Sequence, residues 1–450
     1  MTPAEPDQNA ACSAAVVGNV LKYSQRAGGE GHVDLTDIVG VLPRPGHRSE
    51  YLVLFLDKGQ GHGDDICPRL AKLCIHTLVE GLSPFLTEIP SYLQQGEPVQ
   101  VVISTQSGTG IAKTVYQHAV QPFLTYLAIS HQVHETQSAQ TILELSQSQF
   151  LERACAGIPQ TIILLSGDGG LIDIVDVFYR THRKMHVSPH IALVPCGTGN
   201  AMASSIGLRA GPASSLTGLL WGKSVPMPVF AAKLSPGSQL VVDEGRNRSP
   251  IDADSDAPHR TMYGAVVASW GLHAALVADS DTVDYRKFGS ERFKMAAKEL
   301  LYPSDGTNSH RFQGKLTLTT KDSQTDDLYE KPMEDNEHMY VLATLVPRLE
   351  KEFMISPESE PLGGQMRLLR FGPLPAEEAM RLMTLAYQEG QHVREETVTY
   401  VEVERVRIDF FEDQERWRRI CIDGKIVAVE KGGWMELHKE PRQLLNVIKP

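Results

Sequence analysis

Long apolar runs are missing from this 450-residue chain: no stretch approaches the ~18 uninterrupted apolar residues that a membrane-spanning helix needs. The first residues contain no basic segment followed by an apolar one, so we expect no secretory signal. Cysteine is scarce, with six residues and no pair at the spacing of a metal or redox site. These absences predict a cytoplasmic protein with reduced thiols, whose contact with any membrane is peripheral.

The chain also lacks an excess of positive charge. Lys and Arg number 43 whereas Asp and Glu number 55, which gives a formal charge of −12. Because nucleic-acid binding depends on neutralising phosphates, this balance argues against a nucleic-acid partner. The length allows two or three domains, and 42% hydrophobic and 22% charged residues are typical of globular proteins.

The chain does contain glycine-rich loops placed directly after apolar runs. Residues 161–165 lead into Ser-Gly-Asp-Gly-Gly at 166–170, and residues 191–194 lead into Pro-Cys-Gly-Thr-Gly-Asn at 195–200. A strand that ends at glycines and opens into a helix points free backbone N–H groups, and the positive end of the helix dipole, at an anion. The two loops therefore predict a site for nucleotide phosphates, with Asp168 as its carboxylate.

Other interpretations of these loops stay open. Asp168 could simply cap the helix that follows it, and Asn200 could cap its own helix. A third loop, after residues 99–103, contains Ser107, Gly108 and Gly110 but lacks the Gly-Lys-Ser/Thr ending of a Walker A sequence, so it could be a plain strand–helix turn.

Strand and helix patterns divide the chain into three parts. Residues 1–95 form an N-terminal extension, loose and partly disordered up to about residue 30 and then β-rich, with one helix expected over residues 68–81. In residues 96–225 apolar runs alternate with amphipathic segments, which predicts an α/β domain with a parallel sheet. Residues 226–450 predict a mainly antiparallel β domain, whose C-terminal segment can pack back on the α/β domain.

Two kinds of segment stand out in the last part. Residues 244–260 and 321–336 are polar and predict exposed loops, whereas residues 397–410 and 419–429 predict long strands, the latter with Asp423-Gly424 in a turn or at an edge. In parallel sheets ligands bind beyond the carboxyl ends of the strands, so we expect the three glycine loops along one such edge.

The order of these motifs resembles that of a known family. After the loops come Ser-Trp-Gly-Leu at 269–272, a basic segment at 286–293 and finally Asp423-Gly424. Over residues 97–437 the chain resembles the lipid kinases that share the diacylglycerol kinase catalytic domain, and within them it is most similar to sphingosine (long-chain base) kinases. The resemblance implies a phosphofructokinase-like α/β nucleotide-binding domain followed by a β-sandwich lipid domain.

The same resemblance implies roles for individual residues in the ATP-dependent phosphorylation of a membrane lipid between two domains. Asp168 corresponds to the catalytic aspartate and, through ATP, to a magnesium ligand. Trp270, Asp279 and Asp281 are expected to contact the lipid substrate. The residues expected around the nucleotide are Ser107, Gly108, Gly110, Thr136, Ser166, Gly167, Gly169, Gly170, Gly197, Thr198, Gly199, Asn200, Lys287, Arg292, Asp423 and Gly424.

The chain departs from the family pattern at several positions. Gln106 replaces an arginine, Asp173 replaces a glutamate and Lys425 replaces the glutamate after the late Asp-Gly, while the aspartate that reads the sphingoid head group falls at Ala275. A sphingoid base is the favoured acceptor, with diacylglycerol or ceramide as alternatives. Two further hypotheses remain, a kinase for a water-soluble alcohol and a non-catalytic lipid or nucleotide sensor.

Overall fold

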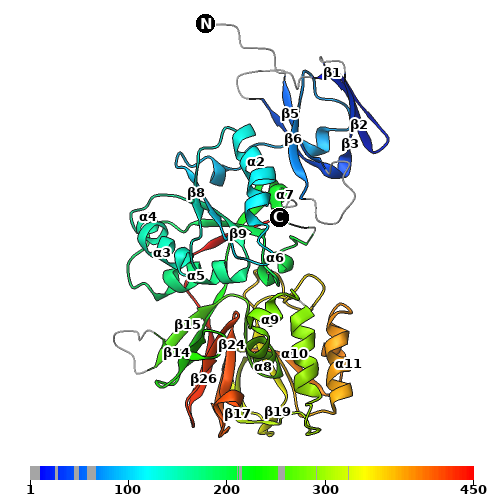
Figure 1. Cartoon of the computed structure of the whole chain (residues 1–450). Coiled ribbons are helices and arrows are strands. Elements are labelled where there is room, and N and C mark those ends of the chain that lie inside the picture. The colour runs from blue at the N-terminus through cyan, green and yellow to red at the C-terminus, as the bar shows by residue number, and fades with distance from the viewer. Residues whose placement is uncertain are drawn as a thin grey trace.

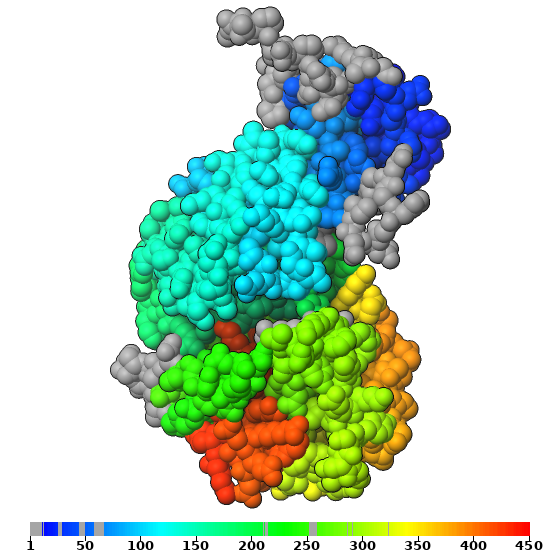
Figure 2. All heavy atoms as spheres, viewed as in Figure 1, coloured from blue at the N-terminus to red at the C-terminus, as the bar shows by residue number. Residues whose placement is uncertain are grey.

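Three parts of the molecule are stacked in the computed structural model, which describes residues 11–25, 29–44, 50–57, 67–209, 211, 215–251, 259–289, 291–322 and 324–450. Figure 1 shows a small β unit at the N-terminal end, an α/β domain in the middle and a β-rich domain at the opposite end. In the space-filling view of Figure 2 the α/β and β-rich domains meet along a broad boundary. No helix among these residues is long and apolar enough to span a bilayer.

The N-terminal unit consists of two three-stranded antiparallel sheets. Their strands are β1 Ala11–Val17, β2 Val20–Gln25 and β3 Glu30–Asp34, then β4 Ile38–Pro43, β5 Tyr51–Asp57 and β6 Arg69–Ile75. The predicted loose segment is therefore wrong over residues 11–25, and the predicted helix over residues 68–81 is wrong because β6 pairs with β5 along its whole length. Leu70, Leu73 and Ile75 are buried in this pairing, which overrides their helical spacing.

This unit is packed tightly on the α/β domain. The indole Nε1 of Trp221 donates to the carbonyl of Val39 at 2.9 Å, and the hydroxyl of Tyr92 donates to the carbonyl of Leu219 at 2.9 Å. Apolar side chains of β4, β5 and β6 share one hydrophobic cluster with the α/β domain. The N-terminal unit is thus an extension of that domain's core.

A six-stranded sheet of order β11-β27-β10-β9-β7-β8 organises the α/β domain. Four strands are parallel neighbours, as the alternating pattern predicts: β7 Val99–Ile103, β8 His131–Glu135, β9 Thr161–Ser166 and β10 His190–Pro195. The last strand of the chain, β27 Asn446–Lys449, lies between β10 and β11 Lys223–Pro226, so the C-terminus returns to this domain.

Helices cover both faces of this sheet. Ile163 and Leu165 of β9 pack with one helical layer, and Ile162 and Leu164 pack with the other. The layers contain α1 Ala112–Val115, the π-helical turn Tyr116–Val120, α2 Gln121–Tyr126 and α7 Ser215–Trp221 on the first face, and α3 Thr141–Leu145, the π-helical turn Ser146–Phe150, α4 Leu151–Cys155, α5 Asp168–Arg180 and α6 Ala201–Ser205 on the second. Near-continuous apolar strands are expected when both faces are buried.

The second domain consists of two antiparallel sheets that share one core. Phe230 and Leu316 from one sheet pack in the same cluster as Trp270 and Val341 from the other. The first sheet contains β15 Arg260–Gly264, β12 Val229–Leu234, β26 Trp434–Glu440, β23 Arg405–Phe410, β17 Phe312–Lys321, β18 Leu328–Pro332 and β19 Glu337–His338. The second contains β14 Asn247–Pro250, β13 Gln239–Val242, β25 Lys425–Ala428, β24 Arg419–Ile422, β16 Val267–Gly271, β20 Tyr340–Thr344, β21 Arg367–Phe371 and β22 Val398–Glu402.

Four helices accompany these sheets, namely α8 Leu272–Ser280, α9 Val283–Arg286, α10 Glu291–Leu301 and α11 Ala376–Ala386. The predicted single strand over residues 397–410 is wrong: β22 pairs with β21 in one sheet, whereas β23 pairs with β17 and β26 in the other. The two polar segments predicted as loops each contain a strand, β14 and β18, because pairing with a neighbouring strand orders a sequence that has little to bury.

Candidate active site

The three glycine loops meet at one edge of the parallel sheet. They follow β7, β9 and β10, which are neighbours in the sheet, so the loops emerge side by side. The backbone N–H of Gly167 donates to Ser107 Oγ at 2.9 Å, and the N–H of Cys196 donates to the carbonyl of Ser166 at 3.0 Å. The loops that the sequence separates by about ninety residues are therefore joined by hydrogen bonds.

Glycine is required where these loops touch. A Cβ atom on Gly108 would lie 2.5 Å from the carbonyl oxygen of Cys196, and one on Gly197 would lie 2.4 Å from Gly167 Cα. Gly108 also has a φ of +56°. A Cβ on Gly169, by contrast, would meet no atom within 4 Å, so the first turn of α5 faces open space beside a close-packed backbone cluster.

Asp168 bridges two of these loops. It is the first residue of α5, and its carboxylate accepts the N–H groups of Ala201 at 2.7 Å and Met202 at 3.0 Å at the start of α6. Asp168 therefore caps the helix of the next loop and not the helix that it begins. Burial raises the pKa of the Asp168 carboxyl, while these backbone N–H groups oppose the increase.

Two further polar contacts close the loops. Asn200, with a φ of +52°, caps no helix but closes its own loop, because its amide accepts from the N–H of Gly197 and donates to the carbonyl of Gly197, each at 2.8 Å. Thr136, at the end of β8, accepts from the N–H of Thr105 at 3.0 Å. Thr198 and Gly110 are exposed at this edge, and Gly170 packs its backbone on Ser166.

Asp423 brings a second carboxylate to this place from the β-rich domain. It occupies the turn between β24 and β25 with a φ of +46°, followed by Gly424 with a φ of +83°, and it accepts N–H groups from Ala265, Val266 and Val267 at 2.5 to 3.1 Å. Burial raises the pKa of Asp423 to about 7, and the negative charge of Asp168 adds to the increase. The two carboxyl groups therefore lie within electrostatic reach of each other, across the two domains.

Known proteins are similar to this chain in sequence. The diacylglycerol kinase catalytic domain matches residues 98–232. Sphingosine kinase 1 of Mus musculus is 24% identical over 355 residues, which cover 74% of this chain and 87% of that protein. Sphingosine kinase 1 of Homo sapiens is 22% identical over 355 residues, which cover 74% and 86%. The chain is therefore similar to lipid kinases that have a diacylglycerol kinase catalytic domain.

The fold of this chain is also found in a solved structure. The crystal structure of a candidate diacylglycerol kinase from Bacillus anthracis str. Sterne matches with a TM-score of 0.53 and 15% identity, over 79% of this chain and 97% of that chain. At this identity the match establishes shared architecture, and the roles of individual residues stay predictions.

Residues 348–350 form a loop that the sequence analysis did not single out, and this loop lies between the segment around Gly199 and helix α10. The N–H of Arg348 donates to Ser205 Oγ at 3.1 Å, and a Cβ on Gly199 would lie 3.4 Å from the carbonyl oxygen of Leu349. Burial raises the pKa of Glu350 to about 7, against the opposing charges of Lys294 and Arg292. Arg292 therefore interacts electrostatically with the residue after Leu349, and its Nη1 lies 3.6 Å from Asp281 Oδ1. No sequence motif marks residues 348–350, because their position depends on packing between domains.

Other predicted site residues, Lys287, Asp279 and Trp270, make ion pairs or lie in the core of the β-rich domain. Lys287 is exposed and pairs with Asp284 at 2.8 Å. Asp279 joins α8 to the β24 region, because its two oxygens accept from Arg416 at 2.8 Å and Arg419 at 2.7 Å. The indole of Trp270 is fully buried in the sandwich core and donates to the carbonyl of Trp417 at 2.8 Å, so its substrate contact stays a prediction.

The donor set does not fit a metal ion held by the protein alone. Among the described residues no group of three or more His, Cys, Asp or Glu side chains is placed to hold one. The oxygens of Asp168 and Asp423 accept backbone N–H groups, and Asp173 pairs with Lys425 at 3.0 Å. These residues therefore offer no ready set of carboxylates for a metal ion in the absence of a nucleotide.

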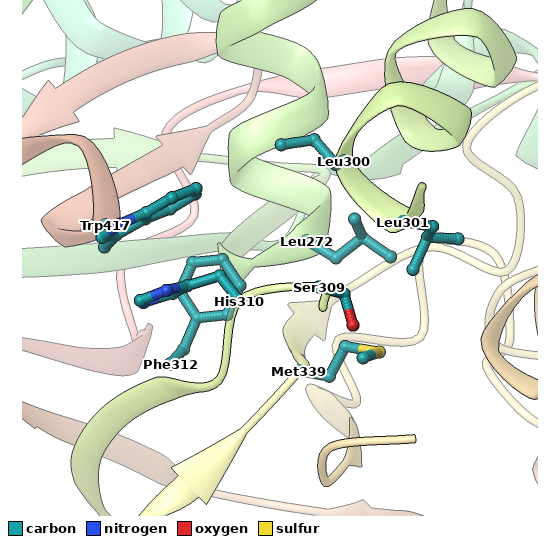
Figure 3. A pocket seen from close by; sticks show the side chains of 8 residues that line it. All are labelled: Leu272, Leu300, Leu301, Ser309, His310, Phe312, Met339 and Trp417. Atoms are coloured by element: carbon teal, nitrogen blue, oxygen red, sulfur yellow. The ribbon is translucent and has the colours of Figure 1, made fainter. Parts of the chain in front are cut away.

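A small apolar cavity lies in the β-rich domain (Figure 3). Its walls come from α8, α10 and β17, and the His310 ring stacks on Trp417 with centroids 4.1 Å apart. Its volume of about 20 Å³ suits one water molecule and excludes a lipid chain. The lining residues are Leu272, Leu300, Leu301, Ser309, His310, Phe312, Met339 and Trp417.

Proposed function

We propose that this lipid kinase transfers the γ-phosphate of magnesium-ATP to a hydroxyl group of a membrane lipid, with a sphingoid long-chain base as the favoured acceptor. The convergence of Gly108, Gly167 and Gly197 beside Asp168 carries the proposal, because backbone N–H groups at strand ends bind phosphate groups. Similarity to two sphingosine kinases over 74% of the chain supports the acceptor.

Asp168 is the proton acceptor in this reaction. The lipid hydroxyl oxygen attacks the γ-phosphorus, the bond to the β–γ bridging oxygen breaks, ADP leaves and the hydroxyl proton passes to Asp168. The N–H groups of Ala201 and Met202 fix the orientation of the carboxylate, and each oxygen keeps a second lone pair. A carboxyl group whose pKa is raised by burial is a better general base near neutral pH.

A neutral acceptor, diacylglycerol or ceramide, is the second candidate. A sphingoid base has a positively charged amine, which an acidic side chain would recognise. Asp279 is engaged by two arginines, and Asp281 lies beside Arg292, so both candidate acids have cationic neighbours. This arrangement supports a lipid without a positive charge as the second candidate, while the similarity to sphingosine kinases keeps the sphingoid base as the favoured acceptor.

A lipid acceptor also requires the protein to reach a membrane. We propose a cytoplasmic protein that contacts the membrane peripherally. The exposed apolar side chains of Val283 and Phe288, 60% and 53% accessible, support this because they lie beside Lys287 on the surface of α9 and the turn after it. Sedimentation with vesicles that contain the acceptor lipid tests the contact directly.

Labelled-ATP transfer to sphingosine, phytosphingosine, ceramide and diacylglycerol in mixed micelles tests the function. We expect transfer to a sphingoid base and none by Asp168→Asn, which keeps the size of the side chain. Preferred transfer to ceramide or diacylglycerol would select the second candidate. Transfer to a water-soluble alcohol without micelles, or ATP binding with no transfer to any lipid, would refute the proposal.

A further inference from the structure

Lys425 connects the two domains at the candidate site. It is the first residue of β25, and its Nζ donates to Asp173 Oδ1 of α5 at 3.0 Å. The two side chains are 28% and 18% accessible, so the pair is partly shielded from water. Burial raises the pKa of the Asp173 carboxyl, whereas Lys425 lowers it. An ion pair so placed is stronger than one on the open surface.

Asp173 and Lys425 are each close in sequence to a residue of the candidate site. Asp173 follows Asp168 by five residues on α5, about 7.5 Å along the helix axis. Lys425 follows Asp423 by two residues in the β24–β25 turn. Asp168 and Asp423 interact electrostatically, and Lys425, which pairs with Asp173, lies on the same hairpin as Asp423 and contacts the same helix that Asp168 begins.

This charge pattern matters for an anionic ligand. A triphosphate that approaches Asp168, Asp173 and Asp423 would meet three acidic groups, of which two are in the same buried region. Phosphoryl transfer requires positive charge near the transferred group. Lys425 is the cation that the hairpin supplies here, and Asp173 restricts its side chain to one place.

We propose that Lys425 is a fixed cation for the phosphate groups of ATP, in the position between α5 and the β24–β25 turn where a carboxylate-bound metal ion would otherwise provide the charge. This inference rests on the proposed lipid kinase activity for its role in turnover. The claim that the Lys425 ammonium group occupies this position, and that a metal ion does not, is independent of the proposed activity.

Thermal unfolding of the full-length protein with increasing MgCl2 and no nucleotide tests the occupancy. The wild type and Lys425→Met are expected to show no shift. Lys425→Glu leaves two carboxylates facing each other. We expect magnesium to raise the melting temperature of this variant by about 2–4 °C, at concentrations about tenfold above the dissociation constant of magnesium for the variant. A wild-type shift as large as that of Lys425→Glu would overturn the proposal, as would no shift in Lys425→Glu.

A charge swap tests the role in turnover. Asp173→Lys/Lys425→Asp rebuilds the ion pair with its ends exchanged, so it should recover the melting temperature that Lys425→Met loses. We expect kcat to stay at least ~10-fold below the wild type, because the cation then sits on α5. Full recovery of kcat would show that the pair only clamps the domains. A wild type without lipid phosphorylation would refute the proposed function, while the magnesium result would still decide the occupancy.

Discussion

Asp168 and Asp423 each precede a glycine, and each accepts backbone N–H groups from a neighbouring loop, but their surroundings differ. Asp168 accepts two N–H groups, at the start of α6, and is followed by Gly169, next to which an added Cβ would meet nothing within 4 Å. Asp423 accepts three N–H groups from the β15–β16 loop and is 9% accessible. Asp168 joins the first turn of α5, which has open space beside Gly169, to the start of α6, and Asp423 holds two segments of the β-rich domain together.

We expect this difference to give the two carboxyl groups different tasks. Burial raises the pKa of both groups, but Asp168 accepts one N–H group on each oxygen, so each oxygen keeps a lone pair that can accept a proton from a ligand. Asp423 accepts three N–H groups, which stabilise a loop and offset part of its desolvation penalty. We therefore predict that the same local sequence, Asp followed by Gly, serves chemistry in one place and architecture in the other.

The largest expected effect is that of Asp168→Asn on turnover. Loss of the general base should lower kcat by about 10³-fold, within the range known for such groups. One amide oxygen still caps α6, so the melting temperature should fall by only a few degrees. Lipid phosphorylation and thermal unfolding check the two effects, with Asp423→Asn as the matched control, which should lose less activity and more stability. If Asp423→Asn lost more activity and less stability than Asp168→Asn, the roles assigned to the two aspartates would be wrong.

Gly197→Ala should have the next largest effect. Its Cβ would lie 2.4 Å from Gly167 Cα, so the two loops must separate and the N–H groups that we propose to bind phosphate move apart. We expect the ATP dissociation constant to rise by about tenfold or more, which corresponds to ~1.4 kcal/mol of lost binding. Calorimetric titration with ATP measures it. For stability, Gly169→Ala is the control, because its Cβ has open space and alanine favours a helix. Unchanged ATP binding in Gly197→Ala would show that the loops do not hold the phosphates.

Asp423 makes stability depend on pH in a definite direction. Its pKa is about 7 in the folded protein and 3.8 as an isolated side chain, so the folded state binds more protons between these values. Stability should therefore decrease as the pH increases from about 4 to 7, by up to about 1.4 kcal/mol per pH unit, and level off above that. Urea unfolding at a series of pH values measures the slope, and Asp423→Asn should reduce it. An equal slope in the variant would assign the titration to other groups.

The smallest expected effect concerns the interaction between the two aspartates. Asp168→Asn removes a negative charge that raises the pKa of Asp423, so that pKa should decrease. The pH at which stability levels off should then move below that of the wild type, by a fraction of a unit to about one unit. Comparing the unfolding free energies of the two proteins over the same pH series detects the change. An unchanged midpoint would place the carboxyl groups too far apart to interact.

Much of the α/β domain could be predicted from local pattern. Alternating apolar runs and amphipathic segments predicted β7, β9, β10 and the helices around them, because strand and helix periodicity are encoded within a few residues. The error at β6 has the same origin: in a seven-residue strand that buries apolar residues on both sides, helical and strand spacing cannot be distinguished, and only pairing with β5 decided between them.

The partners of the site residues could not be predicted. Nothing near Asp168 in the sequence indicates Ala201 as its hydrogen-bond donor, and nothing near Asp173 indicates Lys425, 252 residues away. Residues 348–350 carry no motif and reach the glycine loops only through folding of the β-rich domain.

By itself the sequence determined that strands end at glycines and open into helices, because backbone freedom and hydrophobic period are properties of short segments. Tertiary structure alone decided which N–H groups Asp168 and Asp423 accept, and that Asp173 pairs with Lys425. Those outcomes depend on the burial of each side chain and on the charges of segments far apart in the chain. Neither is defined until the domains are packed together.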